Sequence, residues 1–220
     1  MTISENLPAV RNKIAQACQD AGRRKDACEL IAVSKTVEAD HLRPALDAGQ
    51  RVFGENRIQE SIKKWPQLKA DYDNVELHLI GPLQSNKTRE AVEHFDVVQT
   101  VDREKIATML AKETERQGRS VSFFVQVNIG EEEQKAGINP AQAVDFTLFC
   151  QNELELSVRG LMCIPPVGEN PAPYFALLRK LADQAQLSEL SMGMSGDFEE
   201  AAAFGATYVR VGSAVFGARN

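Results

Sequence analysis

The sequence predicts one α/β domain over residues 1–220, a (β/α)8 TIM barrel with an extra helix at its N-terminus. Eight short apolar segments are present, and each except the last is followed by a longer segment with helical spacing. Strands separated by helices of this length pair in parallel through right-handed crossovers. Eight such units without a long linker favour a closed barrel. An open doubly wound sheet is the alternative, but its Gly-rich turn is missing, because VSKTVEAD after the first strand holds no glycine.

The elements follow one another in a regular order. Residues 2–24 place apolar side chains on one helical face and end near Gly22. The expected strands lie in residues 28–34, 51–54, 75–81, 96–101, 120–129, 156–164, 189–194 and 206–217. The expected helices lie in residues 37–49, 56–68, 85–95, 102–118, 139–152, 170–186 and 196–205. In the helix 102–118, Asp102 is expected to be the N-cap and Gly118 the stop.

Composition excludes several classes of protein. The formal net charge of −6 argues against broad attraction to nucleic acid or to anionic membranes. Four scattered cysteines without metal-ligand spacing indicate reduced thiols and no metal site. The N-terminus has no apolar signal-peptide core, and no apolar run reaches the length of a membrane span. We therefore expect a cytoplasmic globular protein.

Two segments near the C-terminus predict a phosphate site. In (β/α)8 barrels, the loops after strands 7 and 8 and a helix N-terminus commonly bind phosphate. The segment MGMSGD is expected to place Ser195 and Gly196 at the start of a helix, where backbone N–H groups attract anions. The segment RVGS adds Gly212, which permits close backbone approach, and the hydroxyl of Ser213.

A lysine and an arginine are expected at the same end of the barrel. Lys35 directly follows the first buried strand, at the end of the barrel where catalytic residues lie. Partial burial disfavours the charged form of an amine and makes it nucleophilic toward carbonyls. Together with the phosphate site, Lys35 predicts a phosphorylated aldehyde or ketone as ligand, either pyridoxal phosphate or a sugar phosphate. Arg210, two residues before Gly212, favours the former, because a guanidinium can donate a hydrogen bond to a pyridine nitrogen and keep it unprotonated.

Other polar and sulfur-containing residues follow strand ends. His78 is interpreted first as a strand histidine with satisfied hydrogen bonds and only second as a general base. Further candidates for ligand contact are Asn56, Asn86, Lys135 and Met194.

Seven segments in order resemble one family. They are AVSKT, FGENRIQE, HLIGPLQSNK, VNIGEEEQKAGI, RGLMCIPP, LSMGMSGD and RVGSAVFGAR, and they extend from the first strand to the C-terminus. The chain resembles the pyridoxal-phosphate homeostasis proteins of the YggS/PROSC type, whose fold is similar to the N-terminal barrel of alanine racemase.

The resemblance implies a role for each matching residue. Lys35 would hold pyridoxal 5′-phosphate (PLP) as a Schiff base. Ser195, Gly212 and Ser213 would bind its phosphate, and Arg210 would face the pyridine nitrogen. Asn56 and Met194 would lie near the ring, and Lys135 falls at the family's second reactive-lysine position, where it would assist cofactor exchange. His78 is a further secondary candidate, on its position in the chain alone.

The end of the chain bears on whether the protein is an enzyme. GARN follows the last strand directly, so no second domain is expected to supply the tyrosine that racemases of similar fold use as a second base. A racemase with one base lacks a proton donor on the opposite face of the carbanion. We therefore expect no enzyme but a monomeric PLP carrier that delivers the cofactor to apo-enzymes, without nucleic-acid or membrane partners. A weak amino-acid racemase is the alternative, and a Schiff-base aldolase on a phosphorylated sugar ranks third.

Overall fold

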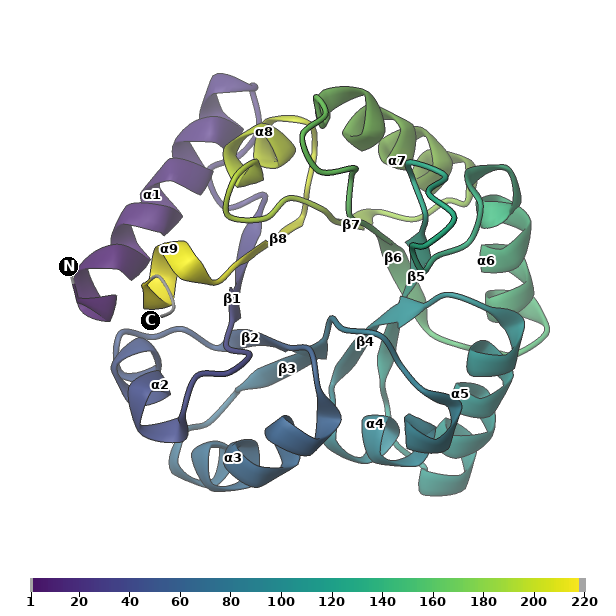
Figure 1. Cartoon of the computed structure of the whole chain (residues 1–220), viewed down its shortest axis with the longest axis horizontal. Coiled ribbons are helices and arrows are strands. Elements are labelled where there is room, and N and C mark those ends of the chain that lie inside the picture. The colour runs from purple at the N-terminus through teal and green to yellow at the C-terminus, as the bar shows by residue number, and fades with distance from the viewer. Residues whose placement is uncertain (1, 218–220) are drawn as a thin grey trace.

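The computed structural model describes residues 2–217, and its centre is a closed barrel of parallel strands (Figure 1). Each strand pairs with the next in sequence order, and β8 pairs with β1 to close the ring, with Ile31 opposite Arg210. The strands are β1 (Glu29–Val33), β2 (Val52–Glu55), β3 (Glu76–Leu79), β4 (Val97–Val101), β5 (Ser122–Val127), β6 (Val158–Cys163), β7 (Glu189–Ser191) and β8 (Tyr208–Val211). The predicted (β/α)8 barrel is confirmed.

Helices surround the barrel (Figure 1). They are α1 (Ile3–Asp20), α2 (Ala39–Asp47), α3 (Ile58–Asp71), α4 (Thr88–His94), α5 (Glu104–Gln117), α6 (Ala143–Asn152), α7 (Ala172–Gln184), α8 (Phe198–Ala203) and α9 (Ser213–Phe216), with 3-10 turns η1 (Ser85–Lys87) and η2 (Pro140–Gln142) before α4 and α6. The extra N-terminal helix α1 packs against α8, α9 and α2. Since α9 is a single turn, α1 covers the part of the ring that a full helix after β8 would cover. No helix of residues 2–217 is long and apolar enough to cross a membrane.

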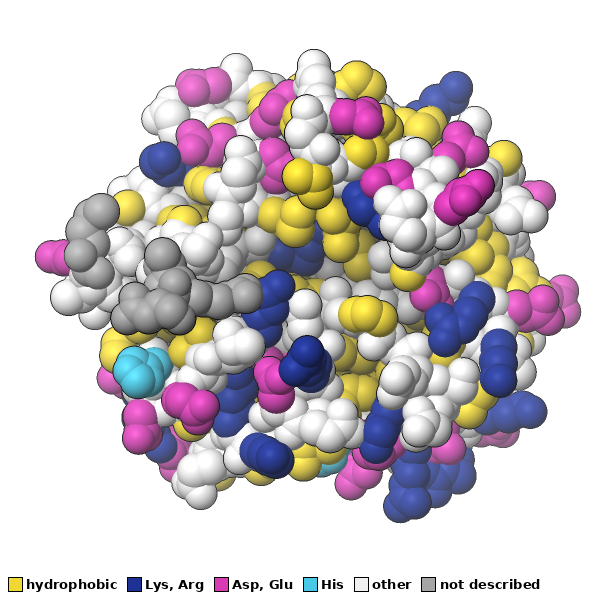
Figure 2. Space-filling model, viewed as in Figure 1, with side chains coloured by type: hydrophobic (Ala, Val, Ile, Leu, Met, Phe, Trp, Pro, Cys, Tyr) yellow, Lys and Arg dark blue, Asp and Glu magenta, His cyan; other side chains and the backbone are white. Residues whose placement is uncertain are grey.

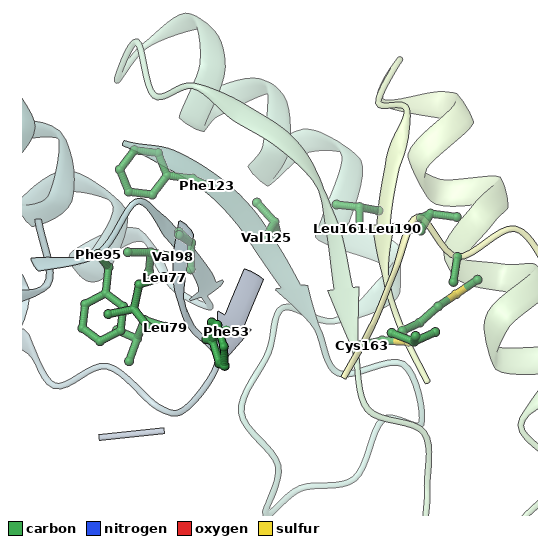
Figure 3. Packing of buried hydrophobic residues seen from close by; sticks show 14 of the residues in the cluster. Phe53, Leu77, Leu79, Phe95, Val98, Phe123, Val125, Leu161, Cys163 and Leu190 are labelled. Carbon is green, nitrogen blue, oxygen red and sulfur yellow. The ribbon is translucent and has the colours of Figure 1, made fainter. Parts of the chain in front are cut away.

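The main hydrophobic core lies between the strands and the helices. Alternate strand residues point outward, so Leu77 and Leu79 of β3 pack toward the helices while His78 between them points into the barrel. Figure 3 shows these leucines beside Phe53 and Phe95. This outer layer fixes the strands and therefore the positions of the loops that leave them.

A second, smaller cluster fills the barrel interior. It contains Ile31, Val52, Val97, Phe124, Met162 and Tyr208. The interior of the barrel is therefore a packed core rather than a channel, as is usual for this fold.

The two ends of α5 and the state of the cysteines can be compared with what the sequence predicts. Gly118 ends α5 in the left-handed conformation (φ 59°), as predicted. The prediction that Asp102 caps α5 is wrong: Arg103 holds the N-cap position, and the carboxylate of Asp102 pairs with the Arg103 guanidinium instead. All four cysteines are buried free thiols.

Candidate functional site

A cavity of about 490 Å³ opens at the carboxyl ends of the strands, on the side of β1 and β8. Figure 2 shows the hollow at the centre of the molecule, with hydrophobic walls and basic side chains beside it. Its volume is within the range of small-molecule sites. The lining residues include Val33, Lys35, Thr36, Glu38, His41, Asn56, Ile80, Ile164, Met194, Ser195, Arg210, Gly212, Ser213 and Phe216. The structure thus brings together all seven residues predicted as primary ligand contacts.

Lys35 lies in the turn between β1 and α2, and a buried ammonium fixes this turn. The Nζ of Lys64 on α3 donates to the carbonyl oxygens of Ser34 (2.7 Å) and Val37 (2.9 Å), one on each side of Lys35 and Thr36. Thr36 adopts a left-handed backbone (φ 63°), which is costly for a β-branched residue unless its surroundings impose it. Lys64 therefore holds the backbone that presents Lys35 to the cavity.

Glu55, at the end of β2, holds Lys64 in turn. Its Oε1 lies 2.7 Å from the Lys64 Nζ and accepts hydrogen bonds from the hydroxyl of Ser34 (2.5 Å) and the indole of Trp65 (3.0 Å). The Glu55 side chain is fully buried and that of Lys64 is 10% exposed. Among residues 2–217, no carboxylate pairs with Lys35 itself, so its amine is available to a ligand.

Asn56 is held close to the end of β3 by a glycine. A Cβ built on Gly81 would lie 2.2 Å from the carbonyl oxygen of Asn56. Only glycine allows the two backbones to approach this closely. The glycine of HLIGP therefore has a packing role that places Asn56 at the cavity wall.

Two serine hydroxyls lie at the predicted phosphate end of the candidate site. The Ser213 Oγ lies 3.2 Å from the Ser195 Oγ, so the loops after β7 and β8 meet at the cavity. Ser213 is the first residue of α9, whose first N–H groups have no partner within the helix. The prediction that Ser195 and Gly196 begin a helix is wrong, because α8 starts at Phe198.

Ser195 and Gly196 instead occupy a turn that Asp197 closes. The Asp197 carboxylate accepts the Met194 N–H at 2.6 Å, and the Asp197 N–H donates to the Met194 carbonyl at 3.1 Å. Asp197 therefore sets the position of the Ser195 hydroxyl. Met194, at the start of the turn, is exposed at the cavity rim.

Arg210 forms part of the cavity wall and is nearly inaccessible to solvent. It is 4% exposed, and its guanidinium donates to the Ser191 hydroxyl and to the Cys163 carbonyl, both at 2.7 Å. Burial lowers the pKa of the guanidinium, while Asp197 and Cys163 act in the opposite direction. No carboxylate of residues 2–217 forms an ion pair with it. A buried cation without a counterion, with N–H groups to spare, favours a ligand atom that accepts hydrogen bonds.

The two secondary candidates lie outside the cavity lining. The ammonium of Lys135 pairs with Glu132 and donates to the Pro165 carbonyl at 3.2 Å. His78 is fully buried inside the barrel and contacts Glu76 and Gln99 through its two ring nitrogens. His78 therefore has the environment of a strand histidine with satisfied hydrogen bonds. Asn86 lies in η1 and is likewise absent from the lining.

The three tyrosines are also outside the cavity. The hydroxyl of Tyr72 donates to Asp47, that of Tyr174 pairs with Glu169, and Tyr208 packs inside the barrel against His78. Among the described residues 2–217, the titratable side chains that line the cavity besides Lys35 and Arg210 are Glu38 and His41.

The sequence alone did not single out several residues that shape the site. Glu55 belongs to the segment FGEN but looks like any strand-end acid, and Lys64 looks like one of many helix-surface lysines. Their spacing of nine residues has no helical or strand periodicity that predicts contact. His41 and Asp197 carried no signal beyond their places near strand ends.

Comparison of the sequence with known families identifies the chain's relatives. Residues 6–220 match the family described as "Alanine racemase, N-terminal domain". The pyridoxal phosphate homeostasis protein of Haemophilus influenzae is 40% identical over 230 residues, which cover 100% of this chain and 97% of the relative. The protein of the same name from Escherichia coli is 39% identical and covers 99% of this chain and 97% of its own length.

Solved structures agree with the sequence comparison. PipY of Synechococcus elongatus without PLP has a TM-score of 0.86 at 39% identity, covering 98% of this chain and 100% of PipY. PipY with PLP bound has a TM-score of 0.84 at 38% identity with the same coverage. Alanine racemase of Clostridium difficile shares the fold, with a TM-score of 0.75 at 12% identity over 99% of this chain and 56% of the racemase. The chain therefore belongs to the pyridoxal phosphate homeostasis protein family, within the alanine racemase N-terminal-domain fold.

Proposed function

We propose that this protein binds PLP covalently through Lys35 and takes part in intracellular PLP homeostasis, holding the cofactor and delivering it to apo-enzymes. This proposal is supported above all by three groups that share one cavity. All three reach the same 490 Å³ space: an amine and a buried guanidinium that have no carboxylate partner among residues 2–217, and two adjacent serine hydroxyls. The names of the relatives and the PLP bound to PipY support it.

These residues fit the chemistry of the cofactor. PLP supplies an aldehyde carbon that condenses with a primary amine and releases water. The Lys35 amine is the nucleophile of the cavity, and Lys64 and Glu55 orient the turn that carries it. The hydroxyls of Ser195 and Ser213 and the backbone at Gly212 would donate to the phosphate oxygens.

Arg210, Asn56 and Met194 would contact the ring. Arg210 would donate a hydrogen bond to the pyridine nitrogen and hold it unprotonated, which weakens the ring as an electron sink. Asn56 and Met194 would lie beside the ring, where a thioether packs well against an aromatic face. Lys135 would assist exchange of the cofactor only after leaving Glu132 and the Pro165 carbonyl.

A carrier fits the cavity better than the alternative, a weak amino-acid racemase. Racemisation needs a proton donor on each face of the reacting carbon. No tyrosine of residues 2–217 lines the cavity, and Glu38 and His41 are the remaining acid–base groups there. A ring nitrogen kept unprotonated by Arg210 would also stabilise a carbanion poorly.

The experiment compares delivery with turnover. PLP-loaded protein is mixed with a PLP-dependent apo-enzyme, and recovered activity is followed with a phosphatase present to destroy free PLP. We expect recovery in the loaded sample and little with free PLP alone. The loaded protein is also incubated with a panel of L-amino acids and analysed for D-enantiomers. Rapid racemisation of any amino acid contradicts the carrier function, and so does failure to reactivate the apo-enzyme.

We further propose that the protein acts as a monomer in the cytoplasm, with no nucleic-acid or membrane partner. Four buried free thiols suit a reducing compartment, and a net charge of −6 disfavours anionic partners. Light scattering during size-exclusion chromatography should give the mass of one 24.3 kDa chain; a mass of two chains contradicts the monomer.

A further inference from the structure

A continuous chain of side-chain hydrogen bonds leads away from Arg210 through the barrel interior. The Arg210 Nη1 lies 2.7 Å from the Ser191 Oγ, which lies 2.6 Å from the Gln99 Oε1. The Gln99 Nε2 lies 2.8 Å from the His78 Nδ1, and the His78 Nε2 lies 2.6 Å from the Glu76 Oε1. The chain joins β8, β7, β4 and β3 and connects the cavity to the opposite end of the barrel.

Every link of this polar chain can donate in the same direction. The Arg210 guanidinium can only donate, so the Ser191 oxygen accepts and its hydroxyl proton goes to Gln99. The amide of Gln99 then donates to the Nδ1 of His78, whose Nε2 carries the proton facing Glu76. This hydrogen bond is the main cause that lowers the pKa of Glu76. Because the chain begins at a donor and ends at a carboxylate acceptor, Ser191, Gln99 and His78 can each accept one hydrogen bond and donate the next.

Burial makes the loss of any one hydrogen bond in this polar chain costly in free energy. Ser191, Gln99 and His78 are each 0% exposed, and the neighbouring interior positions are apolar. Buried polar groups are expensive when a partner is missing, and satisfied networks hold their members in one geometry. Apolar side chains fill the same barrel interior at Ile31 and Val97. The polar residues are therefore not needed to fill space.

We propose that Gln99 and Ser191 are positioning residues that fix the Arg210 guanidinium in the cavity wall for contact with the ring nitrogen of the bound cofactor. This inference rests on the proposed function for the identity of the ligand. Gln99 sets the direction of the Ser191 hydroxyl, and Ser191 receives one Nη of Arg210 while the Cys163 carbonyl receives the other. The remaining N–H groups of Arg210 are then available in a fixed plane.

The positioning is tested first without ligand, by NMR of protein labelled with ¹⁵N-arginine. Loss of signals in Arg210→Lys assigns the Arg210 side chain. Hydrogen bonds at both Nη groups hinder rotation about the Cζ–Nη bonds, so we expect separate, resolved Nη signals in the wild type.

Three variants test which residues cause this. Gln99→Leu and Ser191→Ala should broaden or merge the Nη signals of Arg210. Gln99→Glu keeps an oxygen acceptor for Ser191 and should retain separate signals. Wild-type Nη signals in Gln99→Leu overturn the assignment of Gln99; if Gln99→Leu does not fold, wild-type signals in Ser191→Ala overturn the proposal.

A matched control separates positioning from general loss of a buried amide. Gln50 is also a buried glutamine, 2% exposed, and its Nε2 donates to the carbonyls of Leu30 and Val52 at 2.7 Å each. It lies outside the cavity lining and outside the polar chain. Gln50→Leu should lose stability yet keep the wild-type Arg210 signals. Merged Arg210 signals in Gln50→Leu also overturn the proposal.

The second measurement is PLP affinity, which separates this inference from the proposed function. Gln99→Leu and Ser191→Ala should bind PLP about tenfold more weakly, because a hydrogen bond that orients a charged group is lost. Gln50→Leu should stay within about twofold of the wild type. Wild-type affinity in Gln99→Leu contradicts the link to the cofactor. A wild type that binds no PLP contradicts the proposed function, while the Arg210 signals still decide the positioning.

Discussion

Lys64 and Glu55 form an ion pair of 2.7 Å directly behind the turn that carries Lys35. Glu55 is fully buried, and Lys64 spans the turn by donating to the carbonyls of Ser34 and Val37. Lys35, the proposed attachment point, is therefore positioned by a second lysine that does not line the cavity. Removing one member of such a pair leaves the other charge buried without compensation, which destabilises the protein.

Lys64→Met should lower the free energy of unfolding by about 3 kcal/mol, because it leaves the Glu55 carboxylate buried without its cation. Urea denaturation gives this value. The double variant Glu55→Gln with Lys64→Met should recover part of the loss, since the buried charge is gone. Lys13→Met is the control, because its pair with Glu199 is exposed and should contribute less than about 1 kcal/mol. Equal losses in Lys64→Met and Lys13→Met would show that the buried pair does not matter.

Gly81→Ala should destabilise the protein by about 1–3 kcal/mol and weaken PLP binding, because the added Cβ would lie 2.2 Å from the Asn56 carbonyl. Gly196→Ala is the matched control for stability, since a Cβ there would have no neighbour within 4 Å. Thermal unfolding of both variants measures the loss of stability, and PLP titration of Gly81→Ala measures the loss of binding. Wild-type behaviour of Gly81→Ala contradicts the close approach of these two backbones.

Ser195→Ala and Ser213→Ala should each weaken binding of PLP several-fold and leave binding of pyridoxal, which lacks the phosphate, unchanged. Each substitution removes one hydroxyl from the adjacent pair at the cavity. Competition titrations with the two compounds give the ratio of affinities. An equal loss for both compounds would mean that the serines do not contact the phosphate.

The free energy of unfolding should fall as the pH rises from about 9 toward 12. Burial raises the pKa of Cys28, Cys150 and Cys163 from 9.0 to about 12 each. The unfolded thiols lose their protons near pH 9 and the folded thiols do not, so the stabilisation is complete below pH 9 and is lost above it. Each thiol contributes about 1.4 kcal/mol per pH unit in that window.

Urea denaturation at several pH values measures this slope. Cys150→Ala removes one of the three thiols. The free energy of unfolding should then depend less steeply on pH, by the contribution of one thiol. A free energy of unfolding that stays constant to pH 11 contradicts the burial of these thiols.

The barrel could be predicted from sequence because its signals are local and repeated. Apolar strands such as Leu30–Val33 alternate with amphipathic helices, and that rhythm recurs along the whole chain. The start of α5 was predicted wrongly: Asp102 has the residue type of an N-cap, but its carboxylate pairs with Arg103 instead. The preference of a residue type for a helix end does not determine which group its side chain hydrogen-bonds or pairs with.

The grouping of the candidate contact residues at one cavity could be predicted because strand ends of a barrel converge on one mouth, which places Lys35 and Arg210 together from topology alone. The residues that orient Lys35 and Arg210 could not be predicted from sequence. Lys64 reaches the Lys35 turn from a helix, and Gln99 reaches Ser191 across the barrel, 92 positions along the chain. Those contacts depend on side-chain direction in three dimensions, which periodicity does not specify.

The lysine that carries the cofactor can be identified by chemical labelling. Wild-type protein is loaded with PLP, reduced with borohydride to make the bond permanent, digested and mapped by mass spectrometry. We predict the phosphopyridoxyl mass on the peptide that contains Lys35, at one equivalent per chain. A label mainly on Lys135 or another lysine, or no label at all, would contradict attachment of the cofactor at Lys35.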